Sequence, residues 1–503
     1  MKGLKKMLFD YDDSNLESIY NYAKKLEGMT FREILNEYNN SIQKFYINPN
    51  DKNVPSSQNK GDDTAVIKTT ASKGQLGNIL EKYYFGYSLN SKQEADFAKV
   101  GMELKLTCVD RKKDGSFVAG ERLSITNISY KEEVEENFYK SHVWDKIKLI
   151  LLIQYFRDKS KNNMDFQIMF ANKFTPPGDD LNIIINDYHS IIDKIKDGKA
   201  HDLSESDTMY LGACTKGDNA EKSKVPQFYG THILAKKRNF CLKKQYMDYV
   251  LHTYIIKDRK PIESIITNNN ISPTYISFED QIISLINQHI GKTDFELCQK
   301  FKREYNNNKS QWIDLAYRML GIRSNQAEEF VKANVVVKAI RIEENGKIKE
   351  SMSFPTIKFK EFATQEFDDS DFCNYFEETK FLFVIFKKSG NHYVLKGAQF
   401  WNMPVDDLYG DAQKGWLAIR NKIRNGVTFT IKNNTVYNDL PGSSDNRIMH
   451  IRPHTKQSAY KLNNGFTKGN INRDADQLPN GEWMTTQCLW LNNSYILSQL
   501  KIK

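Results

Sequence analysis

Residues 95–107 read ADFAKVGMELKLT, and this stretch decides the fold. In its second half, apolar residues alternate with other residues, a period that predicts a β-strand whose successive side chains point to opposite faces. Glu103 and Lys105 would therefore point to one face, towards Asp96 at the entry of the strand. Two carboxylates beside a lysine suit a divalent metal ion, with a cation left over for a hydroxide or a phosphate oxygen. The alternative is a surface strand with a solvated ion pair.

The composition is that of a large globular chain. Its 503 residues are enough for two domains of about 230–270 residues each. The formal net charge of +9 is a moderate excess that fits a polyanionic partner without proving one. The six cysteines stand singly, without CxxC spacing, which indicates free thiols in a reducing compartment. We find neither a signal peptide nor an apolar run of about 18 residues, so we expect a soluble, cytoplasmic protein without a membrane partner.

The segments around the strand suggest the rest of the site. KGQLGNILEKYYFGY, residues 73–87, predicts a helix with Glu81 beside its apolar face. Such a glutamate is commonly solvated, but ahead of an acid-acid-lysine strand it is a candidate third carboxylate. The strand continues into a predicted hairpin with its turn at Asp114–Gly115 and its return strand at Leu123–Ile128. We therefore expect an α/β fold, a mixed sheet flanked by helices.

Basic segments offer phosphate contacts. Lys146, in WDKIKL, leads into an apolar strand and either reaches the site or is solvated. The strand MYLGACTKG opens at Thr215 and Lys216 into a loop whose hydroxyl, ammonium and backbone N–H groups suit phosphates or base edges. A basic run is usually a solvated face, but the run that follows lies close to this loop in the chain. Its members are Lys236, Lys237, Arg238, Lys243 and Lys244.

From about residue 270 the order of elements repeats, which predicts tandem copies at 1–268 and 269–503. KSQWIDLAYRMLG echoes KGQLGNILEKYYFG, and EEFVKANVVVKAIRI echoes ADFAKVGMELKLTCV, with four more matches in the same order. The second copy keeps Lys338 at the place of Lys105 and Glu329 at that of Asp96, but has Val336 at that of Glu103. A valine cannot bind a metal ion, so we expect the second copy to be catalytically silent.

The second copy keeps a basic loop. Arg452, His454 and Lys456 lie where the first copy has its Thr-Lys loop. Arginine can read guanine bidentately, which indicates binding without cutting. The alternative is a structural domain with an ordinary charged surface.

Together these motifs resemble the MutH-like endonucleases of the PD-(D/E)xK superfamily, and above all the single-chain, two-domain GATC-cutting type II restriction endonucleases. The resemblance rests on KGQLGNILEKYYFG, Asp96, GMELK, GERLSITNISY, WDKIKL and GKAHDLSESDTMYLGACTKG. It implies two tandem domains of this fold, of which the first cuts double-stranded DNA and the second acts as an effector.

The resemblance also implies residue roles. Asp96 and Glu103 would be ligands of Mg²⁺, with Mn²⁺ as a substitute, and Glu81 would be a further acid at the metal. Lys105 would assist the attacking water, and Lys146 would be a supporting lysine. Lys216 would belong to the loop that reads the site. The chain departs from the family there, because the family's Arg-Pro pair is Cys-Thr at 214–215 and occurs instead at 452–453.

The resemblance further implies a bacterial protein, monomeric in solution, with dimerisation or looping on DNA left open, and a cognate methyltransferase encoded separately. Two other functions stay open. One is a defence or repair nuclease of the same fold with a different or methylation-dependent target. The other is a non-catalytic DNA-binding regulator, against which the intact acids and lysine of the first copy argue.

Overall fold

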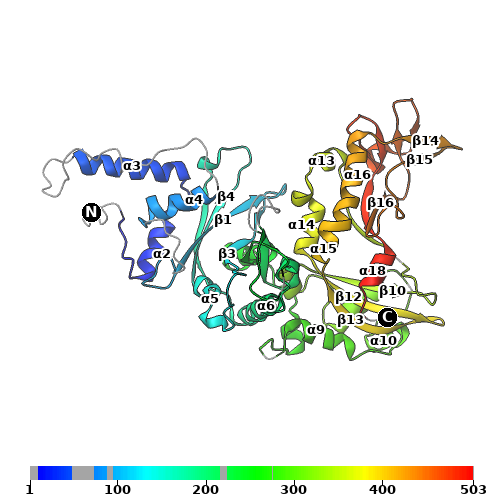
Figure 1. Cartoon of the computed structure of the whole chain (residues 1–503), viewed down its shortest axis with the longest axis horizontal. Helices are drawn as coiled ribbons and strands as arrows, with labels where there is room; N and C mark the ends of the chain where they lie inside the picture. Colours follow the sequence, from blue (N-terminus) through cyan, green and yellow to red (C-terminus); the bar gives the residue numbers. More distant parts are fainter. Residues whose placement is uncertain are drawn as a thin grey trace. The chain divides into compact units, whose positions relative to one another are not determined.

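The computed structural model describes residues 9–47, 73–87, 95–215, 224–230, 232–274, 276–306, 308–349 and 351–501. Its contacts divide the chain into two compact units (Figure 1). Unit 1 comprises residues 1–200 and 210–261, and unit 2 comprises 201–209 and 262–503. Each unit combines one mixed sheet and antiparallel sheets with flanking helices, so the predicted α/β fold is confirmed.

Unit 1 begins with helices and continues with two sheets. Its elements are α2 (Leu16–Lys24), α3 (Phe31–Ile47), α4 (Lys73–Ile79), the π-helical turn η1 (Leu80–Tyr84), β1 (Glu103–Arg111), β2 (Phe117–Ala119), β3 (Leu123–Asn127), η2 (Phe138–Lys140), α5 (His142–Ile147), β4 (Ile150–Phe156), η3 (Asn163–Asp165), β5 (Ile168–Phe174), α6 (Gly178–Lys196), β6 (Leu211–Thr215), β7 (Lys224–Val225), β8 (Ala235–Lys236), β9 (Arg238–Leu242), α7 (Lys244–Val250) and η6 (Leu251–Ile255).

The first sheet of unit 1 has the order β2-β1-β4-β5. β1 runs parallel to β4, with Glu103 opposite Ile150, while β2 and β5 are antiparallel to their neighbours. The first six residues of β4 are buried, as expected for a central strand covered on both faces. An apolar core formed by α2, α3, α4 and the sheet supports β1 on one side.

The second sheet of unit 1 corrects the predicted hairpin. β1 turns back through the short strand β2, with Arg111 opposite Phe117. The expected return strand forms β3 instead, in an antiparallel sheet of order β3-β9-β6, with Leu123 opposite Leu242. A local turn signal does not specify a partner more than 100 residues away, which explains the error.

Unit 2 has the same sheet arrangement. Its elements are η5 (Glu205–Asp207), α8 (Ile265–Asn269), α9 (Phe278–Asn287), α10 (Asp294–Lys300), α11 (Gln311–Met319), α12 (Glu328–Ala333), β10 (Val335–Ile342), β11 (Met352–Thr356), α13 (Phe359–Thr364), η7 (Phe367–Asp369), α14 (Asp371–Glu378), β12 (Lys380–Ser389), β13 (His392–Trp401), α15 (Val405–Asp407), η8 (Leu408–Ala412), α16 (Gln413–Asn425), β14 (Phe429–Lys432), β15 (Thr435–Asn438), β16 (Met449–Pro453), β17 (Tyr460–Lys461), β18 (Thr467–Lys468), α17 (Ile471–Asp474), β19 (Ala475–Gln477), β20 (Trp483–Thr485), β21 (Gln487–Leu491) and α18 (Asn493–Gln499), while η4 (Ala200–Asp202) spans the division between the units.

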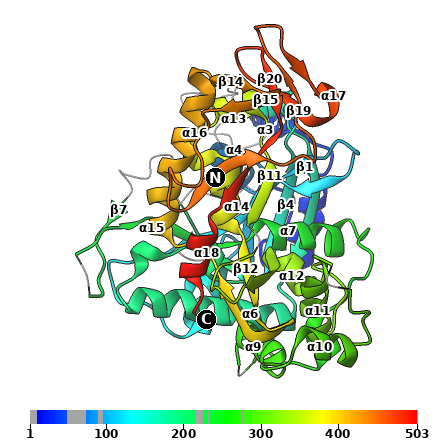
Figure 2. The same cartoon turned by 90° about the vertical axis from the view of Figure 1, so that its right-hand side faces the viewer.

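The sheets β10-β12-β13 and β11-β21-β16 correspond to β1-β4-β5 and β3-β9-β6, with the same parallel and antiparallel pairs. Local details repeat as well. Gly101 lies two residues before Glu103, and Asn334 lies two residues before Val336. Both have positive φ angles. Ser141 caps α5 and Ser370 caps α14 through the same kind of hydrogen bond. Unit 2 adds the hairpin β14–β15 and a small sheet β18-β17-β20-β19, and α13 packs against α16 (Figure 2).

Among the described residues, no helix is both long and apolar enough to cross a membrane.

Candidate active site

Four elements of unit 1 bring the predicted catalytic residues together. Glu103 and Lys105 lie two apart on β1, and Asp96 lies in the turn before it. Lys146 is on α5, which ends just before the parallel strand β4. Glu81 lies on η1, where the helix widens into a π-helical turn, a feature that often marks functional sites.

Glu103 is the centre of the cluster. Its Oε1 lies 3.0 Å from Nζ of Lys105, and its Oε2 lies 2.8 Å from Nζ of Lys146. The backbone N–H of Asp96 donates to Oε2 of Glu103 at 3.3 Å. Only 4% of the Glu103 side chain is exposed, so these donors, rather than water, provide the partners of its oxygens.

Two backbone contacts orient the neighbours of Glu103. Oδ2 of Asp96 accepts a hydrogen bond of 2.9 Å from the N–H of Leu104, which turns this carboxylate towards the start of β1. Nζ of Lys105 donates to the carbonyl of Ile125 on β3 at 3.0 Å. The lysine is thereby held between the two sheets.

The acids of the cluster influence one another. Burial, followed by the charge of Glu103, raises the pKa of Asp96 to about 7. The same two causes raise the pKa of Glu81, while Lys105 and Lys146 act in the opposite direction. A cation beside Asp96 and Glu103 would relieve this repulsion.

The residues present fit a hard divalent cation held by two carboxylates. Asp96 and Glu103 supply the oxygen ligands that Mg²⁺ prefers. Across the described part of the chain, however, no group of three or more His, Cys, Asp or Glu side chains is placed to hold a metal ion. Glu81 faces the same cleft, and its role as a further acid at the metal ion stays a prediction.

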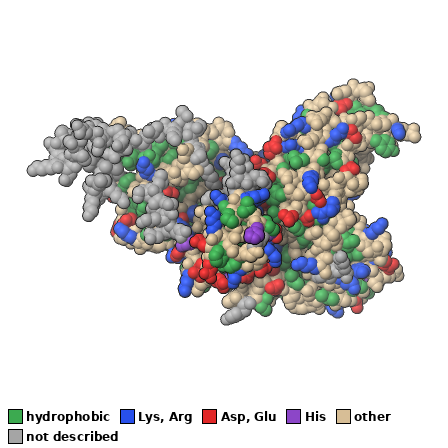
Figure 3. All heavy atoms as spheres, viewed as in Figure 1, with side chains coloured by type: hydrophobic (Ala, Val, Ile, Leu, Met, Phe, Trp, Pro, Cys, Tyr) green, Lys and Arg blue, Asp and Glu red, His purple; other side chains and the backbone are tan. Residues whose placement is uncertain are grey.

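All five predicted catalytic residues line one cleft of about 1050 Å³ in unit 1. Its other walls come from β3 and the segment after it, from α5 and from β9, and are formed by Leu104, Ser124–Lys131, Glu132–Glu135, Ser141–Val143, Tyr188, Ile192, Val225 and Lys237–Phe240. Basic and acidic side chains are interspersed on the surface shown in Figure 3, so the net positive charge is not gathered in one patch of that face.

The predicted DNA contacts of unit 1 are only partly placed. Thr215 ends β6 and is partly buried, and Lys216 lies outside the described residues. Lys244 is partly exposed at the start of α7. Lys243 is a correction, because its side chain is only 2% exposed and belongs to the interior. A run of basic residues gives no indication that one of its lysines is buried.

In unit 2 the equivalent positions have other roles. Val336 lies on β10 opposite Phe381, where β1 has Glu103 opposite Ile150. Glu329 is buried and accepts hydrogen bonds from the hydroxyl of Ser264 and from the first N–H groups of α8, at 2.7–3.1 Å. It therefore anchors a helix start and is not available to a metal ion.

Unit 2 keeps only one of the two lysines. Lys338 stands at the place of Lys105, and burial, assisted by the charge of Lys309, lowers its pKa. Counted from the matching serine caps, Tyr375 stands at the place of Lys146. It lines a cavity of about 310 Å³ with Phe354, Phe372 and Leu489.

The predicted DNA-contacting residues of unit 2 are accessible. Arg452, His454 and Lys456 are exposed at the end of β16 and just beyond it. The guanidinium carbon of Arg452 lies 3.8 Å from the ring centroid of Trp490, so an aromatic face supports the arginine.

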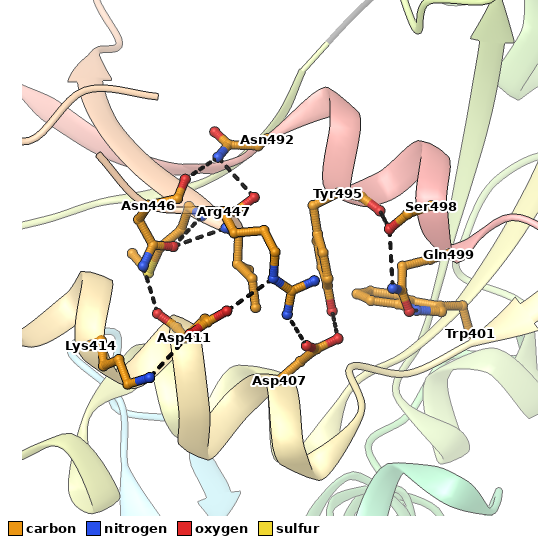
Figure 4. Close-up of polar contacts among 12 residues, drawn as sticks. Trp401, Asp407, Asp411, Lys414, Asn446, Arg447, Asn492, Tyr495, Ser498 and Gln499 are labelled. Atoms are coloured by element: carbon orange, nitrogen blue, oxygen red, sulfur yellow. Dashed lines mark hydrogen bonds and ion pairs between the residues drawn. The ribbon is translucent and has the colours of Figure 1, made fainter. Parts of the chain in front are cut away.

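A polar network fixes the segment that leads into β16 (Figure 4). Arg447 pairs with Asp407 and with Asp411, the latter at 2.9 Å. Tyr495 donates to Asp407 at 2.9 Å, and Asn446 donates to the carbonyl of Asp411 at 2.7 Å. These contacts therefore anchor the residues just before β16, the strand that carries Arg452.

Comparison with known proteins gives matches over both parts of the chain. A family model described as DNA mismatch repair enzyme MutH matches residues 85–187. The type II restriction enzyme Sau3AI of Staphylococcus aureus is 32% identical over 467 residues, which cover 86% of this chain and 93% of that enzyme. The DNA mismatch repair protein MutH of Shigella flexneri serotype 5b (strain 8401) is 28% identical over 188 residues, 37% of this chain and 79% of MutH. MutH of Escherichia coli (strain SMS-3-5 / SECEC) gives the same identity and coverage.

Proposed function

The chain belongs to the type II restriction endonucleases related to MutH, and from that premise we propose that unit 1 cuts double-stranded DNA at GATC in a Mg²⁺-dependent reaction. The observation that carries the proposal is the cluster at the start of β1. There Asp96 and Glu103 meet in a cleft whose lysines, Lys105 and Lys146, lie within 3.0 Å of the Glu103 carboxylate.

The side chains divide the work of phosphodiester hydrolysis. Asp96 and Glu103 would hold Mg²⁺, or Mn²⁺ in its place, which supplies charge against the scissile phosphate and lowers the pKa of a bound water. Lys105, oriented by the carbonyl of Ile125, stabilises the attacking hydroxide and the charge that grows on the phosphoryl oxygens. Lys146 holds the Glu103 carboxylate in place through its ion pair of 2.8 Å, and cleavage leaves a 5′ phosphate.

Digestion of plasmids tests the activity and its target together. A plasmid with GATC sites, methylated or unmethylated, and one without them are incubated with Mg²⁺, with Mn²⁺ or with chelator, and the ends are mapped. We expect metal-dependent cuts at GATC in at least one methylation state. If the plasmid that lacks GATC were cut at the same rate, the proposed GATC target would be wrong. Cutting in the presence of chelator would contradict the proposed dependence on a metal ion.

For unit 2 we propose a catalytically silent effector that binds a second DNA site and promotes cutting by unit 1. Val336 and the helix-capping role of Glu329 leave this copy without the two metal ligands. The exposed guanidinium of Arg452 on Trp490 supports DNA binding, because a stacked arginine is prepared for a base edge or a phosphate.

Plasmids with one and with two GATC sites test the effector. Two sites on one molecule raise the local concentration of the second site, so the two-site plasmid should be cut faster. Arg452→Ala should remove the difference between the plasmids and leave the one-site rate unchanged. Equal rates on both plasmids for the unmodified protein would contradict the effector role.

A further inference from the structure

Three buried polar groups beside the catalytic cleft have no hydrogen-bond partner. They are Nη2 of Arg238, the hydroxyl of Tyr130 and Oδ1 of Asn239. Arg238 and Tyr130 are each only 2% exposed, and all three residues line the cleft of unit 1. Unsatisfied buried polar groups are rare in folded proteins and disfavour the free state, so a ligand in the cleft is their natural source of partners.

Arg238 and Asn239 each have one side-chain nitrogen that is already hydrogen-bonded, which limits the orientation of the free atom. Nη1 of Arg238 donates to the carbonyl of Ala213 on β6 at 2.7 Å. Nδ2 of Asn239 donates to Oγ of Ser124 on β3 at 2.7 Å. The two residues are neighbours on β9, and Arg238 lies directly opposite Thr215, where the predicted reading loop begins.

Tyr130 belongs to the same group. It lines the same cleft as Arg238, and burial raises the pKa of its hydroxyl, while the charge of Arg238 acts in the opposite direction. A neutral hydroxyl can donate or accept, the guanidinium donates and the amide oxygen accepts. A phosphate has no donor for the amide oxygen, whereas the edges of neighbouring bases present both donors and acceptors.

The silent copy lacks this set. On β21, the strand that pairs with β16, Gln487 and Cys488 stand at the positions of Arg238 and Asn239. Gln487 donates its amide to the carbonyl of Thr485 at 2.9 Å. The arginine of the silent copy, Arg452, stands instead at the position of Cys214. Each copy thus has one arginine at this end of its second sheet. Arg238 lies on β9, whereas Arg452 lies on β16, which corresponds to β6.

We propose that Arg238, oriented by the carbonyl of Ala213 and accompanied by Tyr130 and Asn239, reads a guanine edge and so determines the specificity of the cutting unit. This assignment rests on the proposed GATC target. Nη2 of the guanidinium donates to an acceptor of guanine when DNA enters the cleft, while Nη1 keeps its bond to Ala213, and the amide oxygen takes a donor from a neighbouring base.

The test replaces atoms on both sides of the contact. The full-length protein and its Arg238→Met variant are titrated, in chelator, with a GATC duplex, with the same duplex carrying 7-deazaguanine, which lacks the N7 acceptor, and with a duplex lacking GATC. Lys237→Met is the matched control, because Lys237 is the exposed neighbour in the same cleft.

We expect the unmodified protein to bind the 7-deazaguanine duplex roughly 10-fold more weakly than the GATC duplex. Arg238→Met should bind both equally and keep its affinity for the duplex lacking GATC, which also shows that it is folded. Lys237→Met should weaken all duplexes alike and lower the salt slope by about 0.9, the signature of a phosphate contact.

Three results would overturn the assignment. Arg238→Met could keep the discrimination against 7-deazaguanine, or it could weaken every duplex alike, as a phosphate contact or an unfolded variant does. In both cases the unmodified protein still prefers GATC, and the proposed function stands. An unmodified protein without a preference for GATC would contradict the proposed target and the assignment with it.

Discussion

Nζ of Lys105 lies 3.0 Å from Oε1 of Glu103, two residues earlier on β1, while the other oxygen of Glu103 faces Lys146. Both oxygens of a nearly buried carboxylate are therefore matched by an ammonium group. These two contacts hold the carboxylate in place at the start of β1.

Removal of Lys146 should move the pH dependence of cleavage. Lys146 lowers the pKa of Asp96 and of Glu81, so Lys146→Met lets both rise further. The acid limb of the single-turnover rate should shift to higher pH, with a loss of about 10-fold or more at neutral pH. Lys148→Met is the control, because Lys148 pairs with Asp145 outside the cluster. An unshifted profile in Lys146→Met would show that the lysine does not act on these acids.

Asp96 should make the metal-free protein less stable in alkali. Its pKa rises on folding from 3.8 to about 7, so the protonated form contributes stability that is fully present below pH 3.8 and is lost as the pH rises through about 7. Asp96→Asn avoids this loss. Above pH 7, in chelator, its free energy of unfolding should exceed that of the unmodified protein by on the order of 1–2 kcal/mol.

Urea unfolding on either side of that window measures the effect. Asp145→Asn, a change at a more exposed carboxylate, should not reproduce it. An Asp96→Asn protein that is less stable than the unmodified one at alkaline pH would show that ionised Asp96 does not oppose folding.

Glu329 should stabilise unit 2 without taking part in cutting. Glu329→Ala removes a buried acceptor from the hydroxyl of Ser264 and from two N–H groups at the start of α8. Unit 2 should lose about 2 kcal/mol or more, against less than about 0.5 kcal/mol for the exposed control Glu361→Ala. Equal stability of the two variants would refute the capping role.

The sequence predicts the strand, the shared face of Glu103 and Lys105 and the repeated order of elements, because period and spacing are local properties. Pairing over long distances is not local, so β3 was expected beside β1 and lies beside β9 instead. The sequence also does not show which residue of a basic run is buried, so it does not predict that Lys243 lies in the interior. The unsatisfied groups of Tyr130 and Asn239 have no signal in the sequence, since they depend on which partners the fold leaves out.

We propose that unit 1 alone cuts DNA, and a matched pair of substitutions in the full-length protein tests this proposal. Glu103→Gln and Glu329→Gln each replace one buried carboxylate by an amide, the first in the cutting copy and the second in the silent copy. Single-turnover cleavage of a one-site GATC duplex in Mg²⁺ should fall by at least about 10²-fold in Glu103→Gln and stay near the unmodified rate in Glu329→Gln. Cleavage by Glu103→Gln at the unmodified rate would show that the site of unit 1 is not where DNA is cut.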